Sequence, residues 1–226
     1  MKVIFDFDDV IFDARQFKEV IFRSFEKRGY ENIRTAYEAV RKQSTPFSLK
    51  GFIIQVTFDS SLENVESMYD EIMSTCPHML NQQVVLLMKS LGKENCYIVT
   101  NGDTEFQLEK IHRSLGHSLV EEIVIVSGTK ANEIKKFCHK HQEEEVIFVD
   151  DKELFINDLF FEECPNLKTV LFNEHGLENL EAKIEESRKN EMLHGRFSPP
   201  SDTEGIPLEE TPSHRLEQQR SPFGFH

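Results

Sequence analysis

Several residue types and patterns are scarce in this sequence, and each shortage removes a class of protein. Tryptophan is absent, but 19 phenylalanines and a hydrophobic content of 38% suffice for one α/β core with a small accessory domain. No apolar run approaches the roughly 20 residues of a membrane-spanning helix. Asp6, Asp8 and Asp9 interrupt the first apolar stretch, which argues against a secretory signal peptide. We therefore expect a cytoplasmic protein with no membrane partner.

Cysteine is scarce and widely spaced. No C-x-x-C pair occurs among the four cysteines, which are Cys76, Cys96, Cys138 and Cys164. This spacing is typical of buried thiols in a reducing compartment and argues against disulfides or a zinc site.

Positive charge is in short supply as well. The chain has 26 Lys and Arg against 40 Asp and Glu, a net charge of −14. Nucleic-acid binding needs a basic surface, so we expect no nucleic-acid partner. An anionic substrate would need a concentrated local source of positive charge, such as a metal ion together with a lysine.

Short apolar runs separated by helical patterns predict the fold. Runs rich in Val, Ile and Phe predict buried strands at 2–8, 96–101, 122–127 and 145–151, with a weaker one at 168–172. Helical patterns at 104–115, 131–141 and 152–160 separate the later strands. Runs without polar alternation are typical of parallel strands covered on both faces. The sequence thus predicts an α/β fold with a doubly wound, Rossmann-like parallel sheet.

The long gap before the second strand predicts an insert. About 80 residues separate the first two strands, and they carry helical patterns at 33–40, 49–58, 62–73 and 79–91, after one that ends at Gly29. We interpret 15–87 as a small helical insert, with 1–14 and 88–187 forming the sheet domain.

The C-terminal part of the sequence has a different composition. Five of the eight prolines lie between 199 and 222. Such a composition cannot offset its ordering entropy, so we predict a disordered tail at 188–226.

Polar side chains follow four of the predicted strands. The strand ends carry Asp6 and Asp8, then Thr100 and Asn101, then Lys130, then Asp150 and Asp151. In an open parallel sheet, ligands bind beyond the carboxyl ends of the strands. Residues two apart on a strand face the same side, and two close carboxylates repel unless a cation or shared proton relieves them. The alternative is an ordinary polar turn, which Asp often builds.

The residue types at these strand ends suit phosphoryl transfer. Several carboxylates without neighbouring His or Cys are hard oxygen ligands of the kind that Mg²⁺ prefers. Thr100 can donate to a phosphate oxygen, and the start of the helix that follows it favours an anion. Lys130 can screen the negative charge, although taken alone it could equally be a solvated surface lysine.

Four motifs in this order resemble the haloacid dehalogenase superfamily of aspartate-nucleophile phosphohydrolases. They are DFDDV at 6–10, YIVTNG at 97–102, SGTKANEI at 127–134 and VIFVDD at 146–151. The resemblance implies a haloacid dehalogenase-like core with an all-helical cap inserted after the first strand. Asp9 departs from the family pattern, which often has Gly there.

The resemblance also implies roles for these residues. Asp6 would be the nucleophile, and Asp8 would protonate the leaving oxygen and then activate water. Mg²⁺ would be held by Asp6, by the backbone carbonyl of Asp8 and by the acidic pair, with Asp151 favoured over Asp150 as the direct ligand. Thr100 and Asn101 would hold the phosphate, with Lys130 completing the charge compensation.

The function expected from these roles is that of a Mg²⁺-dependent phosphatase. It would hydrolyse a small phosphorylated metabolite through an aspartyl-phosphate, and an acid at position 8 favours phosphoesters over the dehalogenation carried out by another branch of the family. Two alternatives stay open: a phosphomutase or phosphotransferase of the same fold, and a non-catalytic protein that binds a phosphate or a partner. The sequence leaves the substrate and the oligomeric state open.

Overall fold

A five-stranded parallel sheet organises the chain. The computed structural model describes residues 1–193 except 44, 59–60 and 116–118. The strands lie in the order β3-β2-β1-β4-β5, and every neighbouring pair is parallel. Their bounds are β1 Lys2–Phe5, β2 Cys96–Asn101, β3 Glu122–Val126, β4 Val146–Asp150 and β5 Leu167–Leu171. All five predicted strands are confirmed, most of them one to three residues shorter than the apolar runs suggested.

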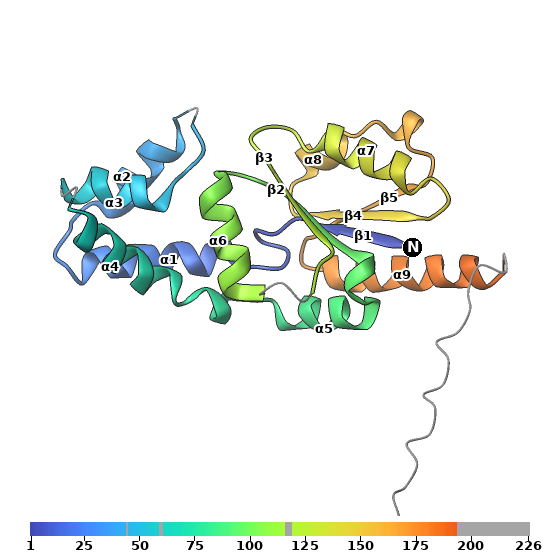
Figure 1. The fold of residues 1–226 in the computed structure, drawn as a ribbon, viewed down its shortest axis with the longest axis horizontal. Coiled ribbons are helices and arrows are strands. Elements are labelled where there is room, and N and C mark those ends of the chain that lie inside the picture. Colours follow the sequence, from blue (N-terminus) through green and yellow to red (C-terminus); the bar gives the residue numbers. More distant parts are fainter. Residues whose placement is uncertain (44, 59–60, 116–118, 194–226) are drawn as a thin grey trace, which may run out of the picture.

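Helices cover both faces of the sheet, as a doubly wound fold requires. On one face lie α5 (Gln82–Leu91), α6 (Thr104–Leu115) and α9 (Gly176–Leu193), and on the other lie α7 (Ala131–Lys140) and α8 (Glu153–Asn157) (Figure 1). Alternate β1 side chains separate accordingly: Val3 and Phe5 join the α5, α6 and α9 cluster, whereas Ile4 packs with Ile134 of α7. The strands are therefore apolar on both sides, which explains their unbroken hydrophobic runs.

Helix α8 is shorter than the predicted 152–160. It ends at Asn157, and the chain then turns so that Leu159 is buried in the core cluster. The following Phe160 and Phe161 remain on the surface. Burial of Leu159 thus overrides the continuous helical pattern in the sequence.

Four helices between β1 and α5 form a separate unit at one end of the molecule (Figure 1). They are α1 (Ala14–Glu26), α2 (Ile33–Arg41), α3 (Leu49–Thr57) and α4 (Leu62–Met73). The Asp13 carboxylate accepts a hydrogen bond from the Gln16 N–H at 2.8 Å, a side-chain cap that begins α1 at the first residue after the sheet domain. We call residues 14–73 the lid.

The lid is smaller than the predicted insert of 15–87. The boundary predicted at residue 87 falls inside the continuous helix α5. Val84 and Met88 of that helix are fully buried in the main core cluster, and the Cys96 thiol of β2 donates to the Met88 carbonyl at 3.6 Å. Helix α5 therefore packs with the sheet domain, and a short 3-10 helix at Cys76–Met79 leads back to it from the lid.

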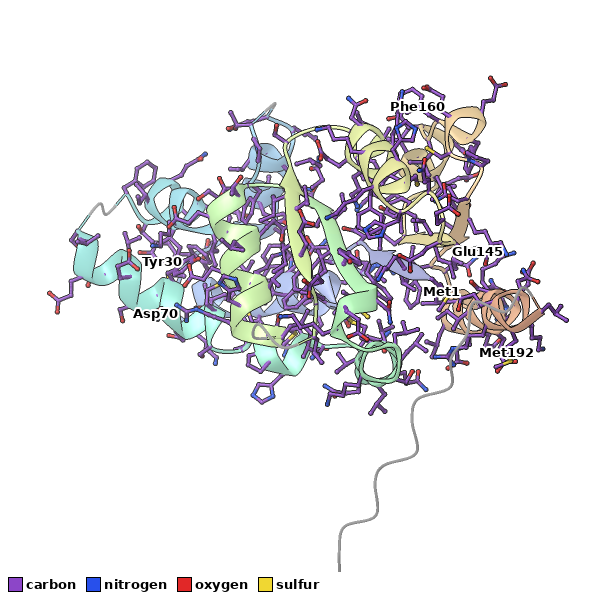
Figure 2. The ribbon with its side chains drawn as sticks, turned by 45° about the vertical axis from the view of Figure 1, so that its right-hand side comes forward. Met1, Tyr30, Asp70, Glu145, Phe160 and Met192 are labelled. Carbon is purple, nitrogen blue, oxygen red and sulfur yellow. The ribbon has the colours of Figure 1, made fainter. Side chains whose placement is uncertain are left out.

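The predicted disordered tail begins too early. Helix α9 continues to Leu193 and so includes 188–193. Leu180, Ile184 and Ser187 are buried on its inner face, and the Met1 amino group lies 2.5 Å from the Glu191 carboxylate. Figure 2 labels Met1 and Met192, next to Glu191 in this helix. These contacts order residues that composition alone assigned to the tail. The rest of the prediction, 194–226, lies outside the described residues.

Two expectations drawn from scarce residues can be compared with the structure. All four cysteines are buried and free, as the spacing predicted. In the part of the chain that the structure describes, no helix combines the length and apolar character needed to cross a membrane.

Candidate active site

Three carboxylates meet where β1 and β4 end side by side. Asp6 follows β1 directly, Asp150 ends β4, and Asp151 comes next. One carboxylate oxygen from each lies within 4.8 Å of the others. Asp6 is 2% exposed and Asp150 is fully buried. The pairing of the two strands therefore brings together carboxylates separated by about 145 positions in the chain.

A buried lysine lies between two of these carboxylates. Lys130, at the N-terminus of α7, is 1% exposed. Its Nζ lies 2.8 Å from Asp6 and 2.6 Å from Asp150, and 4.6 Å from the centre of the Phe155 ring. A lysine this enclosed by two carboxylates is not the solvated surface residue that the sequence left as an alternative.

One lysine does not neutralise the acidic cluster. Burial raises the pKa of Asp6 to about 6 against the attraction of Lys130, and the charges of Asp150 and Asp8 add to the rise. Three convergent carboxylates, among which Asp6 resists ionisation in this way, fit a divalent cation, because a cation favours their charged forms. Their oxygen-only chemistry suits Mg²⁺.

Asp8 has different partners from Asp6. Its carboxylate accepts hydrogen bonds from Lys110 Nζ at 2.6 Å and from Gln107 Nε2 at 2.8 Å. Burial opposes the ionisation of Asp8, but the charge and hydrogen bond of Lys110, supported by Gln107, lower its pKa. Two aspartates on one short motif therefore have their pKa values moved in opposite directions, a pattern typical of unequal roles in one site.

The phosphate-binding candidates lie at the end of β2. Thr100 is 1% exposed. The Asn101 side-chain amide donates to the Gly128 carbonyl at 2.5 Å, so one of its N–H groups is already used to hold the loop before Lys130. The Thr100 hydroxyl and the second N–H of Asn101 are therefore the side-chain donors that this strand end can offer to a ligand.

Asp9, where the resembled family often has Gly, has a backbone conformation that glycine adopts readily. Its φ of 59° lies in the left-handed region, which Asp tolerates better than most residues with a side chain. Burial raises the pKa of Asp9, and the charge of Asp151 raises it further. An Asp at this position instead of Gly thus adds a further carboxylate beside the three-carboxylate cluster.

Comparison with known proteins decides the fold. No protein-family model and no curated protein matches the sequence. A hydrolase from Streptococcus pneumoniae TIGR4 is similar over 81% of this chain and 97% of its own, with 17% identity and a TM-score of 0.51. A haloacid dehalogenase-like hydrolase from Burkholderia xenovorans LB400 is similar over 77% and 83%, with 18% identity and a TM-score of 0.55. The chain has the haloacid dehalogenase-like fold. The fold predicted from the four motifs is thereby confirmed.

Within this haloacid dehalogenase-like fold, a cleft of about 490 Å³ lies between the sheet domain and the lid. The residues predicted from the sequence that line it are Asp6, Asp8, Thr100, Asn101 and Lys130. Asp151 lines a neighbouring cleft of about 760 Å³ beyond Asp9. The lid contributes side chains from α1 and α2, and from the turn at Pro46 and Phe47.

Sequence reasoning missed Gln107 and Lys110 as site residues. They lie 99 and 102 positions after Asp8 and belong to no motif. A signal was present, because both lie on the buried face of α6 with Phe106 and Ile111, where a polar residue needs a partner. The partner itself becomes visible only when α6 is placed over the Asp8 turn.

Proposed function

We propose that this protein is a Mg²⁺-dependent phosphatase of small phosphorylated metabolites. The observation that carries the proposal is the pair formed by Asp6 and Asp8. The Asp6 carboxylate is buried beside Lys130 and two further carboxylates. The Asp8 carboxylate accepts hydrogen bonds from Lys110 and Gln107 and lines the same cleft. Binding alone does not require two aspartates in such different settings, whereas nucleophilic attack coupled to proton transfer does.

Asp6 would act as the nucleophile. Its carboxylate oxygen attacks phosphorus, an aspartyl-phosphate forms, and the ester oxygen leaves. Asp6, Asp151 and the backbone carbonyl of Asp8 would hold a Mg²⁺ ion, with Asp150 in support, and the ion would supply charge neutralisation and polarisation of the phosphoryl group. Lys130 contacts the carboxylates of both Asp6 and Asp150 and would hold the Asp6 carboxylate in position for attack.

Asp8 would move the protons. In the first step the protonated form of Asp8, a minority in the free enzyme because its pKa is lowered, would give its proton to the leaving oxygen. In the second step the carboxylate left behind would take a proton from the water that attacks the aspartyl-phosphate. The contact with Lys110 keeps its carboxylate ionised, which suits the second step. Thr100 and the backbone N–H groups at the start of α6 would bind the phosphate oxygens.

The lid would give the site its selectivity. It closes one wall of the cleft and so limits the water that can reach the aspartyl-phosphate before the leaving group departs. A cleft of about 490 Å³ has the size of a small-molecule site. It admits small phosphate esters more readily than a phosphorylated protein.

Turnover of an aryl phosphate by the full chain in Mg²⁺ tests the proposal. We expect Asp6→Asn to abolish turnover, and Asp8→Asn to accumulate a phosphorylated Asp6 peptide detectable by mass spectrometry, because breakdown is slowed. Asp13→Asn is the matched control, since Asn also caps a helix and Asp13 touches neither the cluster nor Asp8. Undiminished turnover by Asp6→Asn would exclude this residue as the nucleophile.

A further inference from the structure

The lid wall of the cleft is positively charged, although the chain as a whole is acidic. Residues 14–73 contain nine Lys and Arg and nine Asp and Glu, in a chain whose net charge is −14. On the surface that lines the cleft the balance changes: the lid contributes Arg15, Lys18 and Arg41 against the single carboxylate of Glu38. The positive charge of the lid is thus concentrated where a substrate would lie.

Two of these cations have no carboxylate partner among the described residues. Other lid cations do: Arg28 lies 2.5 Å from Glu71, and Arg34 lies 2.7 Å from Glu19. Lys18 instead lies 6.0 Å from the centre of the Tyr37 ring, and Arg41 forms no ion pair within the described part of the chain. Lys18 is half-buried and Arg41 is exposed, so both charged groups are accessible to an anionic ligand, to which their hydrogen bonds would be charge-assisted.

Tyr37 lines the lid side of the same cleft. Its ring is held by aromatic contacts with Phe22 at 5.3 Å, Phe47 at 5.0 Å and Phe52 at 5.7 Å between centroids. Burial raises the pKa of the phenol, and the charge of Asp8 adds to the rise while that of Arg41 opposes it. The packed ring fixes the position of the hydroxyl on the cleft lining, and among the described residues no hydrogen-bond acceptor pairs with it.

An aromatic surface joins this lid wall to the sheet domain. Phe106 of α6 lies 6.4 Å from Phe17 and 5.8 Å from Phe47, measured between ring centroids, and all three line the cleft. A ligand that spans the cleft would meet carboxylates, Lys130 and Thr100 at one end, an apolar middle, and Lys18, Tyr37 and Arg41 at the other. The cleft is thus polar at both ends, and each end carries a donor set suited to an anion.

We propose that Lys18, Tyr37 and Arg41 form a second anion-binding subsite. The subsite rests on the proposed phosphatase activity. It assigns the substrate to the class of small phosphate esters whose other end carries a carboxylate or a second phosphate. One end of such a molecule would be attacked by Asp6, and the other would be held by the lid. Occupation of the subsite would also link the lid to the sheet domain through the substrate, so that a matching substrate favours the closed arrangement.

Kinetics with three matched esters tests the subsite in the full chain with Mg²⁺. The esters are 2-hydroxyethyl phosphate, whose far end is neutral, 2-phosphoglycolate, whose far end is a carboxylate, and ethylene glycol bisphosphate, whose far end is a phosphate. We expect kcat/KM to be at least about 10-fold higher for one or both charged esters. The preferred one identifies which anion the subsite takes.

Arg41→Gln and Tyr37→Phe should each remove about 10- to 150-fold of this preference, the fold-change expected from one hydrogen bond to a charged group. Turnover of the neutral ester should stay within about twofold, because neither residue touches the carboxylate cluster. Lys42→Gln is the matched control: it removes the neighbouring positive charge on the same helix end, but Lys42 does not line the cleft. It should preserve the preference.

Equal kcat/KM for the neutral and charged esters would overturn the subsite, and so would a Lys42→Gln effect as large as that of Arg41→Gln. If none of the three esters is hydrolysed, the proposed phosphatase activity fails, and calorimetric titration decides the subsite separately. Tighter binding of 2-phosphoglycolate than of inorganic phosphate, lost in Arg41→Gln, would uphold it. Equal binding of the two would overturn it.

Discussion

Replacing Asp6 by Asn should make the metal-free protein more stable at neutral pH, even though it removes the proposed nucleophile. Asn has the size of Asp, and its side-chain oxygen can still accept from the Phe7 N–H at 2.7 Å and from Lys130, 2.8 Å away. Lys130 also keeps its contact with Asp150 at 2.6 Å. The substitution therefore removes a buried negative charge while leaving its hydrogen bonds in place.

The magnitude follows from the raised pKa of Asp6. In the folded chain this pKa is about 6, against an ordinary value of 3.8, and each unit corresponds to about 1.4 kcal/mol. The ionised form therefore costs the folded protein about 3 kcal/mol at neutral pH, on the order-of-magnitude scale of such shifts. Because the folded chain holds the Asp6 proton more tightly, the contribution of Asp6 to stability is highest below about pH 4 and is lost as the pH rises through about 6.

Urea and thermal unfolding in EDTA measure this cost. At pH 7.5 we expect Asp6→Asn to unfold with a free energy about 2–3 kcal/mol higher than the parent chain, which corresponds to roughly 5–10 °C for a domain of this size. The difference should shrink as the pH is lowered from 6 to 4. Added Mg²⁺ should stabilise the parent chain by mass action and narrow the gap, since the variant lacks one ligand.

Two results would refute the reasoning. If the parent chain and Asp6→Asn are equally stable at pH 7.5 in EDTA, the buried carboxylate carries no net penalty. If the difference is the same at pH 4 and pH 7.5, it arises from packing and not from ionisation of Asp6. The exposed control Asp13→Asn should show neither the stabilisation nor its pH dependence.

Three further predictions concern the surroundings of the site. Lys110→Met should lower the free energy of unfolding in urea at pH 7 by about 2–4 kcal/mol, because it leaves the Asp8 carboxylate without its buried partner; unchanged stability would contradict the ion pair. Tyr69→Phe removes the 2.6 Å hydrogen bond from the lid to Glu109 of α6 and should raise KM with a loss of about 1 kcal/mol in unfolding free energy, whereas an unaltered KM would argue that this contact does not hold the lid. Chelation of divalent cations should stop turnover of an aryl phosphate, Mg²⁺ should restore it, and persistent turnover in EDTA would exclude a metal requirement.

The strand ends show how far the sequence reaches into the site. Asp6, Thr100, Lys130 and Asp150 were placed together because parallel strands end at one edge of the sheet, a rule that needs no coordinates. The structure brings Asp6, Thr100 and Lys130 to one cleft wall, with Asp150 buried in contact with Lys130. Helices 62–73 and 104–115 were also predicted with the bounds observed, since both have a clear apolar stripe.

Residues outside the motifs were predictable only in part. Gln107 and Lys110 lie on a helix whose periodicity predicts burial, but no spacing rule connects them with Asp8. Lys50 of the lid lies 2.9 Å from Glu66 and does not line the cleft between lid and sheet domain, whereas Lys18 of the same unit does. The direction in which a lid side chain points depends on how its helix packs, which composition does not encode.

The sequence by itself determined the parallel sheet and the positions of its reactive ends, because strand patterns, chain order and the geometry of parallel sheets leave few arrangements. Only the tertiary structure decided what surrounds those ends. It buried Asp6, which raises the pKa of that carboxyl, and it set Lys110 beside Asp8, which lowers the pKa of the other. It also placed Lys18, Tyr37 and Arg41 across the cleft. These outcomes depend on distances between residues far apart in the chain, and such distances are fixed only when the lid and the helices pack against the sheet.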